Sequence, residues 1–108
     1  MTVGVVLAED HQMFRQALGQ VLAQNGITLL GEASDGREAV EVVQEREPGI
    51  VVMDISMPRL NGIEATIQIR AATPQTRVIM LSRFGEQNPV VRALRAGADG
   101  YLLKNDAV

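Results

Sequence analysis

The chain has 108 residues, with 10 Lys and Arg, 13 Asp and Glu, no Cys, and a formal net charge of -3 at pH 7. This length suits a single domain with a hydrophobic core. The acidic balance argues against attraction to a nucleic-acid backbone, so we expect no direct nucleic-acid contact by this segment. The absence of Cys excludes disulfides and thiolate metal sites. Neither a secretory signal nor an apolar run long enough for a bilayer is found, so we expect a cytoplasmic protein without a membrane partner.

Short apolar runs rich in β-branched residues alternate with longer segments of helical periodicity. After the first run, apolar residues such as Phe14, Leu18 and Val21 recur at helical spacing, and Asn25-Gly26 ends this first helix because Gly tolerates a positive φ. Such alternation is typical of βαβ units that build a parallel sheet. Five strands are predicted, near residues 3–8, 28–33, 50–53, 77–81 and 100–103.

Three further helices are predicted from their start and stop signals. Asn, Asp and Ser side chains cap helix N-termini, Pro suits the first helical position, and Gly or Pro follows a helix end. The signals are Ser34-Asp35-Gly36 with a stop before Pro48, Asn61-Gly62 with a helix through Arg70 and a stop at Thr73-Pro74, and Asn88-Pro89 with a helix to Ala96-Gly97.

The expected fold is α/β, with a central five-stranded parallel sheet, strand order 2-1-3-4-5 and helices on both faces. In this order the topological switch point lies between strands one and three, where such sheets bind ligands. Asp10 and Asp54 then lie on neighbouring strand ends, about 5 Å apart between backbones. Their side chains are therefore expected to share one cation.

Polar residues follow four of the five predicted strands: Glu9-Asp10, Asp54, Ser82 and Lys104. The carboxyl ends of parallel strands meet at one edge, so these groups should surround Asp54. Oxygen ligands favour Mg²⁺. We expect it to bind Asp10, Asp54, Glu9 directly or through water, and the backbone carbonyl of Ser56. An ionised Asp54 beside Mg²⁺ and Lys104 is then placed to attack a phosphoryl donor and become an aspartyl phosphate.

These residues resemble the receiver domains of two-component response regulators over essentially the whole chain. Segments 9–18 and 95–104 look most like the subgroup whose receivers precede a LuxR-type helix-turn-helix. The positions that carry the resemblance are the acidic pair Glu9-Asp10, the phosphoacceptor Asp54 with Met57-Pro58 and Asn61-Gly62 after it, Ser82, the aromatic Tyr101 and Lys104.

The resemblance implies a flavodoxin-like doubly wound fold and a signalling switch that takes a phosphoryl group from a sensor histidine kinase. It also implies that Ser82 hydrogen-bonds the phosphoryl group and that Tyr101 turns from an outward to a buried rotamer. A LuxR-type DNA-binding output domain, absent from this chain, would respond in the full-length protein. Such a switch is not an enzyme, and catalyses at most its own phosphoryl transfer and dephosphorylation.

Three features depart from the family pattern. Asn105 follows Lys104 where many receivers have Pro after a cis peptide bond. Arg83 and Phe84 follow Ser82 where many receivers have a small residue, and we expect them, together with Met57, to modulate phosphoryl lifetime and access by small donors. The chain also stops where receivers usually begin a fifth helix. We therefore expect residues 1–108 to be a truncated receiver domain whose uncovered sheet face promotes self-association.

Other interpretations stay open at this stage. Asp54 could serve as the nucleophile of a Mg²⁺-dependent phosphohydrolase, although Ile55-Ser56 offers no second acid after it. A flavodoxin-like cofactor binder would need a phosphate loop where Glu9-Asp10 stands, and a degenerate receiver would never meet phosphate. The structural alternatives are that Asp54 caps a loop, Glu9 and Asp10 cap the first helix, Lys104 forms a surface ion pair, Ser82 makes a turn and Tyr101 packs. His11, the single histidine, is expected to be solvated.

Overall fold

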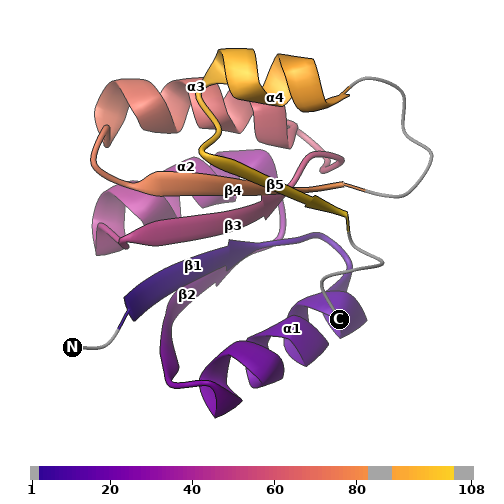
Figure 1. Ribbon diagram of the computed structural model, residues 1–108, viewed down its shortest axis with the longest axis vertical. Coiled ribbons are helices and arrows are strands. Elements are labelled where there is room, and N and C mark those ends of the chain that lie inside the picture. Colours follow the sequence, from indigo (N-terminus) through magenta and orange to yellow (C-terminus); the bar gives the residue numbers. More distant parts are fainter. Residues whose placement is uncertain (1–2, 83–88, 104–108) are drawn as a thin grey trace.

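The computed structural model describes residues 3–82 and 89–103, which form five strands and four helices in alternation (Figure 1). The bounds agree with the sequence prediction to within two residues at the ends that it named. The elements are β1 (Val3–Ala8), α1 (Gln12–Gln24), β2 (Ile27–Ala33), α2 (Gly36–Arg46), β3 (Ile50–Asp54), α3 (Gly62–Ala72), β4 (Arg77–Ser82), α4 (Pro89–Ala96) and β5 (Gly100–Leu103).

The sheet is parallel throughout, and its strand order β2-β1-β3-β4-β5 confirms the predicted topology. Helix α1 packs against β1 and β2 on one face, whereas α2, α3 and α4 lie together on the other (Figure 1). The order reverses between β1 and β3, because the chain passes first to β2 on one side and then to β3 on the other. This switch point is where the predicted acids leave the sheet.

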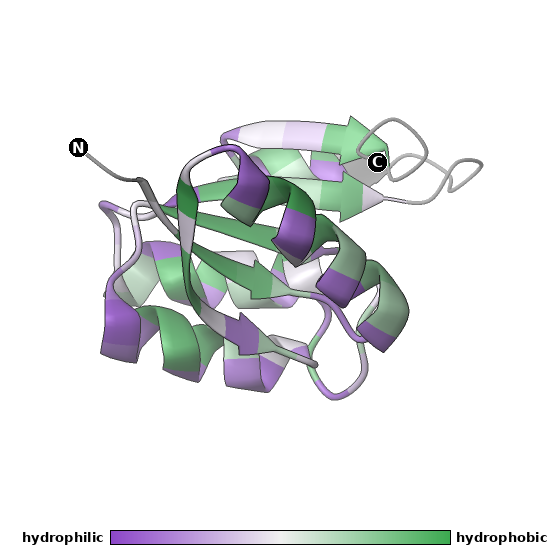
Figure 2. Cartoon of the chain, turned by 90° about the horizontal axis from the view of Figure 1, so that it is seen from below, coloured by the Kyte–Doolittle hydropathy of each residue, from purple (hydrophilic) through white to green (hydrophobic). Residues whose placement is uncertain are grey.

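Alternating side chains of the strands supply two cores, one on each face of the sheet. Val51 and Met53 of β3 are fully buried on the face covered by α2, α3 and α4, and Leu7 of β1 and Leu81 of β4 are buried with Leu18 beneath α1. Figure 2 shows mainly apolar strands between helices that carry both hydrophilic and hydrophobic residues. A sheet with a hydrophobic core on each face accounts for the nearly continuous apolar runs in the sequence.

The predicted capping signals are confirmed for two helices. Asp35 accepts a hydrogen bond from the Glu38 amide at the start of α2. Asn61 and Glu64 form a capping box at the start of α3. Asn88, the predicted cap of the fourth helix, lies outside the described residues. Helix α3 continues to Ala72, two residues beyond the predicted end at Arg70, because the stop signal acts only at Thr73.

The face beneath α1 is incompletely covered in the part of the chain that the structure describes. Val52 and Ile79 are half-buried there, and Leu102 of β5 is 48% exposed. Along each strand, these side chains alternate with residues that point into the core under α2, α3 and α4, so they point to the face of α1. This is the apolar sheet face beside the first helix that we expected to be uncovered. None of the helices that the structure describes is long and apolar enough to cross a membrane.

Candidate functional site: an acidic cluster at the ends of β1 and β3

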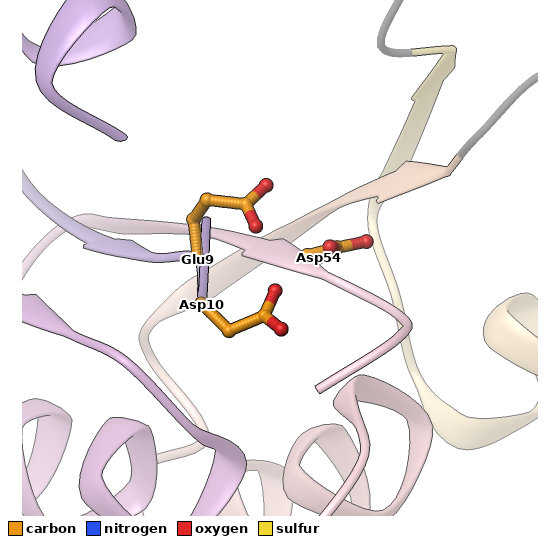
Figure 3. A group of neighbouring side chains, drawn as sticks. All are labelled: Glu9, Asp10 and Asp54. Carbon is orange, nitrogen blue, oxygen red and sulfur yellow. The ribbon is translucent and has the colours of Figure 1, made fainter. Parts of the chain in front are cut away.

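Three carboxylates meet at the carboxyl edge of the sheet. Glu9 and Asp10 follow β1, and Asp54 is the last residue of β3 (Figure 3). One carboxylate oxygen from each lies within 4.8 Å of the other two. Glu9 and Asp54 are fully buried, and Asp10 is exposed. We call these three residues the acidic cluster; it confirms the predicted meeting of the acids at the switch point.

The loop after β1 is held by hydrogen bonds to Glu9. The Glu9 amide donates to the Ala33 carbonyl at the end of β2 (2.9 Å), and the Glu9 carboxylate accepts from the His11 amide (2.9 Å). His11 is the N-cap residue of α1 and makes no side-chain capping bond. Its side chain is exposed, as expected. Glu9 therefore supports the start of α1 through the His11 amide, while its carboxylate stays within the acidic cluster.

The loop after β3 turns sharply so that Asp54 lies at its start. The Ile55 amide donates to the Leu81 carbonyl of β4 (3.0 Å), and the Gly62 amide donates back to the Ile55 carbonyl (2.8 Å). A Cβ on Gly62 would lie 2.3 Å from the Asp54 carbonyl oxygen, so only glycine permits this closure. The Ser56 amide donates to the Asp54 carboxylate at 3.3 Å. Asp54 is thus the last residue of a paired strand and the first of a closed loop.

The same loop is joined to the N-terminus of α2. Arg59 has a positive φ of 67°, a strained backbone for this residue type, and its guanidinium donates to the Asp35 carboxylate at 2.6 Å. The Glu38 amide and then Arg59 hold the pKa of Asp35 below its ordinary value, against the opposing effect of burial. Sequence reasoning identified Asp35 only as a cap. It missed Arg59, because nothing in a local pattern pairs two residues so far apart in the chain.

The donor set fits a hard divalent cation. All three residues offer carboxylate oxygens, the ligand type that Mg²⁺ prefers. Negative charges this close repel one another unless a cation lies between them. Oxygens that share one Mg²⁺ lie about 3 to 4 Å apart, since each is about 2.1 Å from the ion. The observed limit of 4.8 Å is slightly wider. A small rotation of one side chain, or one ligand acting through water as expected for Glu9, closes the difference.

The other predicted site residues differ in their surroundings. Ser82 is the last residue of β4 and is fully buried, beside the strand that ends in Asp54. Tyr101 of β5 is half-buried and packs against the core beneath α4, and Met57 is buried in that same core. Lys104, Arg83 and Phe84 lie outside the described residues. The direction of the Ser56 carbonyl remains a prediction.

A family model described as the response regulator receiver domain matches residues 5–107. The chain belongs to this receiver family. Among curated relatives, the response regulator protein VraR of Staphylococcus aureus is 41% identical over 105 residues, which are 96% of this chain and 50% of the relative. The receiver domain described here thus spans about half the length of the curated relatives that it matches.

Solved structures agree with the receiver fold. The signal receiver domain of the response regulator NarL from Mycobacterium tuberculosis superposes with a TM-score of 0.92 at 33% identity, covering 97% of this chain and 86% of that chain. A DNA-binding response regulator of the LuxR family from Staphylococcus aureus gives 0.89 at 30% identity, covering 95% and 87%. These matches confirm the predicted resemblance to the LuxR-type subgroup. They also favour a receiver over a phosphohydrolase or a flavodoxin-like cofactor binder.

Proposed function

We propose that this receiver domain is a phosphorylation-activated switch that accepts a phosphoryl group on Asp54 from a sensor histidine kinase. The acidic cluster carries the proposal, because it gathers the carboxylates of Glu9 and Asp10 around that of Asp54 at the end of β3. Asp54 is fully buried at the base of the site, whereas Asp10 lies at its surface. A donor would therefore approach past Asp10 to reach Asp54.

The chain's own residues have distinct parts in the transfer. A carboxylate oxygen of Asp54 attacks the phosphorus of a phosphohistidine in line with the P–N bond. The new O–P bond forms as the P–N bond breaks. The electron pair of the P–N bond leaves with the imidazole, which then takes a proton from water. Glu9, Asp10, Asp54 and the Ser56 carbonyl would hold Mg²⁺. The bound ion would neutralise charge on the phosphoryl oxygens. Lys104, which follows Leu103 in the sequence, would add a second positive charge.

The surroundings of Asp54 support a switch without sustained turnover. A phosphohydrolase with an aspartyl nucleophile typically carries a second acid two residues after the nucleophile, which serves as the proton donor. Here Ile55 is buried, and at the next position the Ser56 amide donates to Asp54. No acid stands at either position. The aspartyl phosphate would therefore persist long enough to signal.

The signal would pass from Ser82 to Tyr101. Ser82 ends β4 one residue beyond the Leu81 that pairs with Asp54. This position near the end of β3 supports the proposal that the Ser82 hydroxyl would donate to a phosphoryl group on Asp54. Tyr101 pairs in register with Met80 on the adjoining strand. Movement of the β4 end toward Asp54 would open space for Tyr101 to turn inward. The phosphoryl group shifts this equilibrium only by its different interaction energy with the two states.

The wider context is also a proposal. Because the chain spans about half of its curated relatives, we place residues 1–108 as the receiver part of a longer cytoplasmic regulator with a LuxR-type DNA-binding output domain. The receiver itself would contact neither nucleic acid nor membrane. Its formal charge of -3 supports the first of these two statements.

Incubation with acetyl phosphate and Mg²⁺, followed by intact mass measurement, tests the proposed function. We expect one phosphoryl group per chain in the wild type and none in Asp54→Asn, whose amide keeps the shape but forms no acyl phosphate. Chelation of Mg²⁺ should abolish the addition. Continuous phosphate release over many turnovers would instead identify a phosphohydrolase. Equal labelling of Asp54→Asn would reject Asp54 as the acceptor.

A further inference from the structure

One arginine joins the loop of the acidic cluster to two other elements. Arg15 lies in the first turns of α1, and its Nη1 donates to the Glu9 backbone carbonyl at 2.7 Å. Its Nε donates to the Glu32 carboxylate on β2 at 2.9 Å. The Arg15 side chain is only 18% exposed, whereas that of Glu32 is 47% exposed. The largely buried Arg15 guanidinium therefore bonds the backbone carbonyl of Glu9 on one side and the more exposed Glu32 carboxylate on the other. We call Arg15 with these two acceptors the Arg15 bracket.

The bracket acts on the peptide group that connects Glu9 to Asp10. A peptide is planar, so fixing the direction of its carbonyl also fixes how the chain enters the next residue. The Glu9 amide is already bonded to Ala33, and the Glu9 carboxylate to the His11 amide. With the carbonyl held by Arg15, every polar group of Glu9's backbone has a fixed partner. The directions in which the Glu9 and Asp10 side chains leave the loop are then determined together.

A guanidinium suits this task better than an ammonium. Its planar fork offers several N–H groups at fixed angles, so Nε and Nη1 reach two acceptors that lie in different directions. A Lys at this position carries the same charge but brings it to one point. Lys can therefore bond the carbonyl or the Glu32 carboxylate, but it does not reproduce the geometry of both bonds.

We propose that Arg15 is a positioning residue that sets the divalent-cation affinity of the acidic cluster by orienting the Glu9–Asp10 peptide. The inference rests on the proposed function, in which this cluster holds Mg²⁺. Groups that orient metal ligands without touching the ion commonly change metal affinity by about 10- to 100-fold when removed. For Arg15, which acts through a backbone carbonyl, we expect about tenfold weakening.

The sign of the change separates this role from simple electrostatics. Arg15 is positively charged and bonded to the backbone of a proposed ligand, so its charge opposes the binding of a cation. If charge were its main influence, Arg15→Gln would tighten Mg²⁺ binding, and Arg15→Lys would leave it unchanged. If Arg15 orients the peptide, both substitutions weaken binding. A purely structural role would lower the melting temperature and leave the affinity of the folded protein unaltered.

Titration calorimetry with Mg²⁺ alone, without any phosphoryl donor, provides the test. The variants are Arg15→Gln, Arg15→Lys and Glu32→Gln, with thermal melts in chelator to measure stability separately. Arg46→Gln is the matched control, because Arg46 is an exposed helical arginine paired with Glu45 at the opposite, amino edge of the sheet. We expect about tenfold weaker binding for both Arg15 variants, a smaller loss for Glu32→Gln, and wild-type affinity for the control.

The outcomes distinguish the two proposals. Wild-type affinity or tighter binding in Arg15→Gln and Arg15→Lys, with the wild type binding Mg²⁺ and becoming labelled on Asp54, would overturn the positioning role alone. A wild type that neither binds Mg²⁺ nor accepts a phosphoryl group would overturn the proposed function together with this inference. If Arg15→Gln does not fold, Arg15→Lys and Glu32→Gln decide, because both keep a polar group of nearly the same size.

Discussion

Individual side chains hold the two loops of the acidic cluster. Arg15 bonds the loop after β1, and Arg59 bonds the loop after β3 to Asp35. In sequence, each of these residues looks like an ordinary surface charge. Their roles depend on partners 17 and 24 positions away, across elements whose packing no local pattern specifies. Sequence could therefore identify the carboxylates of the site, but not the groups that orient the loops.

The Asp35 carboxylate should make the free energy of unfolding depend on pH at low pH. Its carboxylate accepts from the Glu38 amide and pairs with Arg59, which together lower its pKa below the ordinary value of 3.8. A lowered folded pKa contributes stability that is fully present above the unfolded pKa and is lost as pH falls through the folded pKa. We expect Asp35→Ala to reduce the free energy of unfolding by about 1 to 2 kcal/mol at pH 7, through loss of the cap and the ion pair. Urea unfolding of the wild type and the variant measures this difference in the free energy of unfolding.

Asp35→Asn is the companion variant, because it keeps an oxygen for the cap and loses the charge. It should cost about 0.5 kcal/mol at pH 7, and its unfolding free energy should converge on that of the wild type as the pH falls below the ordinary value of 3.8 toward the lowered folded pKa, where the wild-type carboxyl becomes protonated. A gap between the two proteins that stays constant from pH 7 to pH 3 would contradict the account of the Asp35 charge.

The strands and helices were largely predictable, for identifiable reasons. Both faces of the sheet carry a hydrophobic core, so the strands are short continuous apolar runs that contrast with the helical periodicity between them. Asp35 and Asn61 combine a cap side chain with a following glycine, which marks the helix start sharply. Where the signal was weaker the bounds moved: α3 extends to Ala72, since Ala71 and Ala72 favour the helix until Thr73-Pro74 stops it.

The face beneath α1 predicts self-association. Leu102 is 48% exposed on this face beside the half-buried Val52 and Ile79. We expect light scattering of the chain to give a mass that rises with concentration, because apolar area of this kind is buried by contact with another copy. Leu102→Glu should shift the population toward the monomer by placing a charge in that contact.

Ile67→Glu is the matched control for this prediction. Ile67 is 54% exposed on α3, on the opposite side of the sheet from Leu102, so a charge there leaves the uncovered face intact. It should associate like the wild type. A wild-type chain that remains a monodisperse, thermally stable monomer at all concentrations would show that this face does not drive association.

The topology of the whole domain brings the site together. Asp54 is the forty-fourth residue after Asp10, yet the two meet because parallel strands β1 and β3 are neighbours and end at one edge. This convergence was predictable once the strand order was inferred, since it needs only chain direction and crossover handedness. The separation of the carboxylate oxygens and the burial of Glu9 were not, because they depend on how the loops are held. The proposed roles of Ser82 and Tyr101 likewise depend on motion between two states of the fold.

Mapping the modified residue tests the central claim most directly, namely that the acidic cluster holds a cation against a modifiable Asp54. After labelling with acetyl phosphate, borohydride reduces an aspartyl phosphate to homoserine, which tandem mass spectrometry locates in the sequence. We predict homoserine at position 54 alone, formed only with Mg²⁺ and strongly diminished in Asp10→Asn. Homoserine at another position, or undiminished labelling of residue 54 without Mg²⁺ and without the Asp10 carboxylate, would contradict the account.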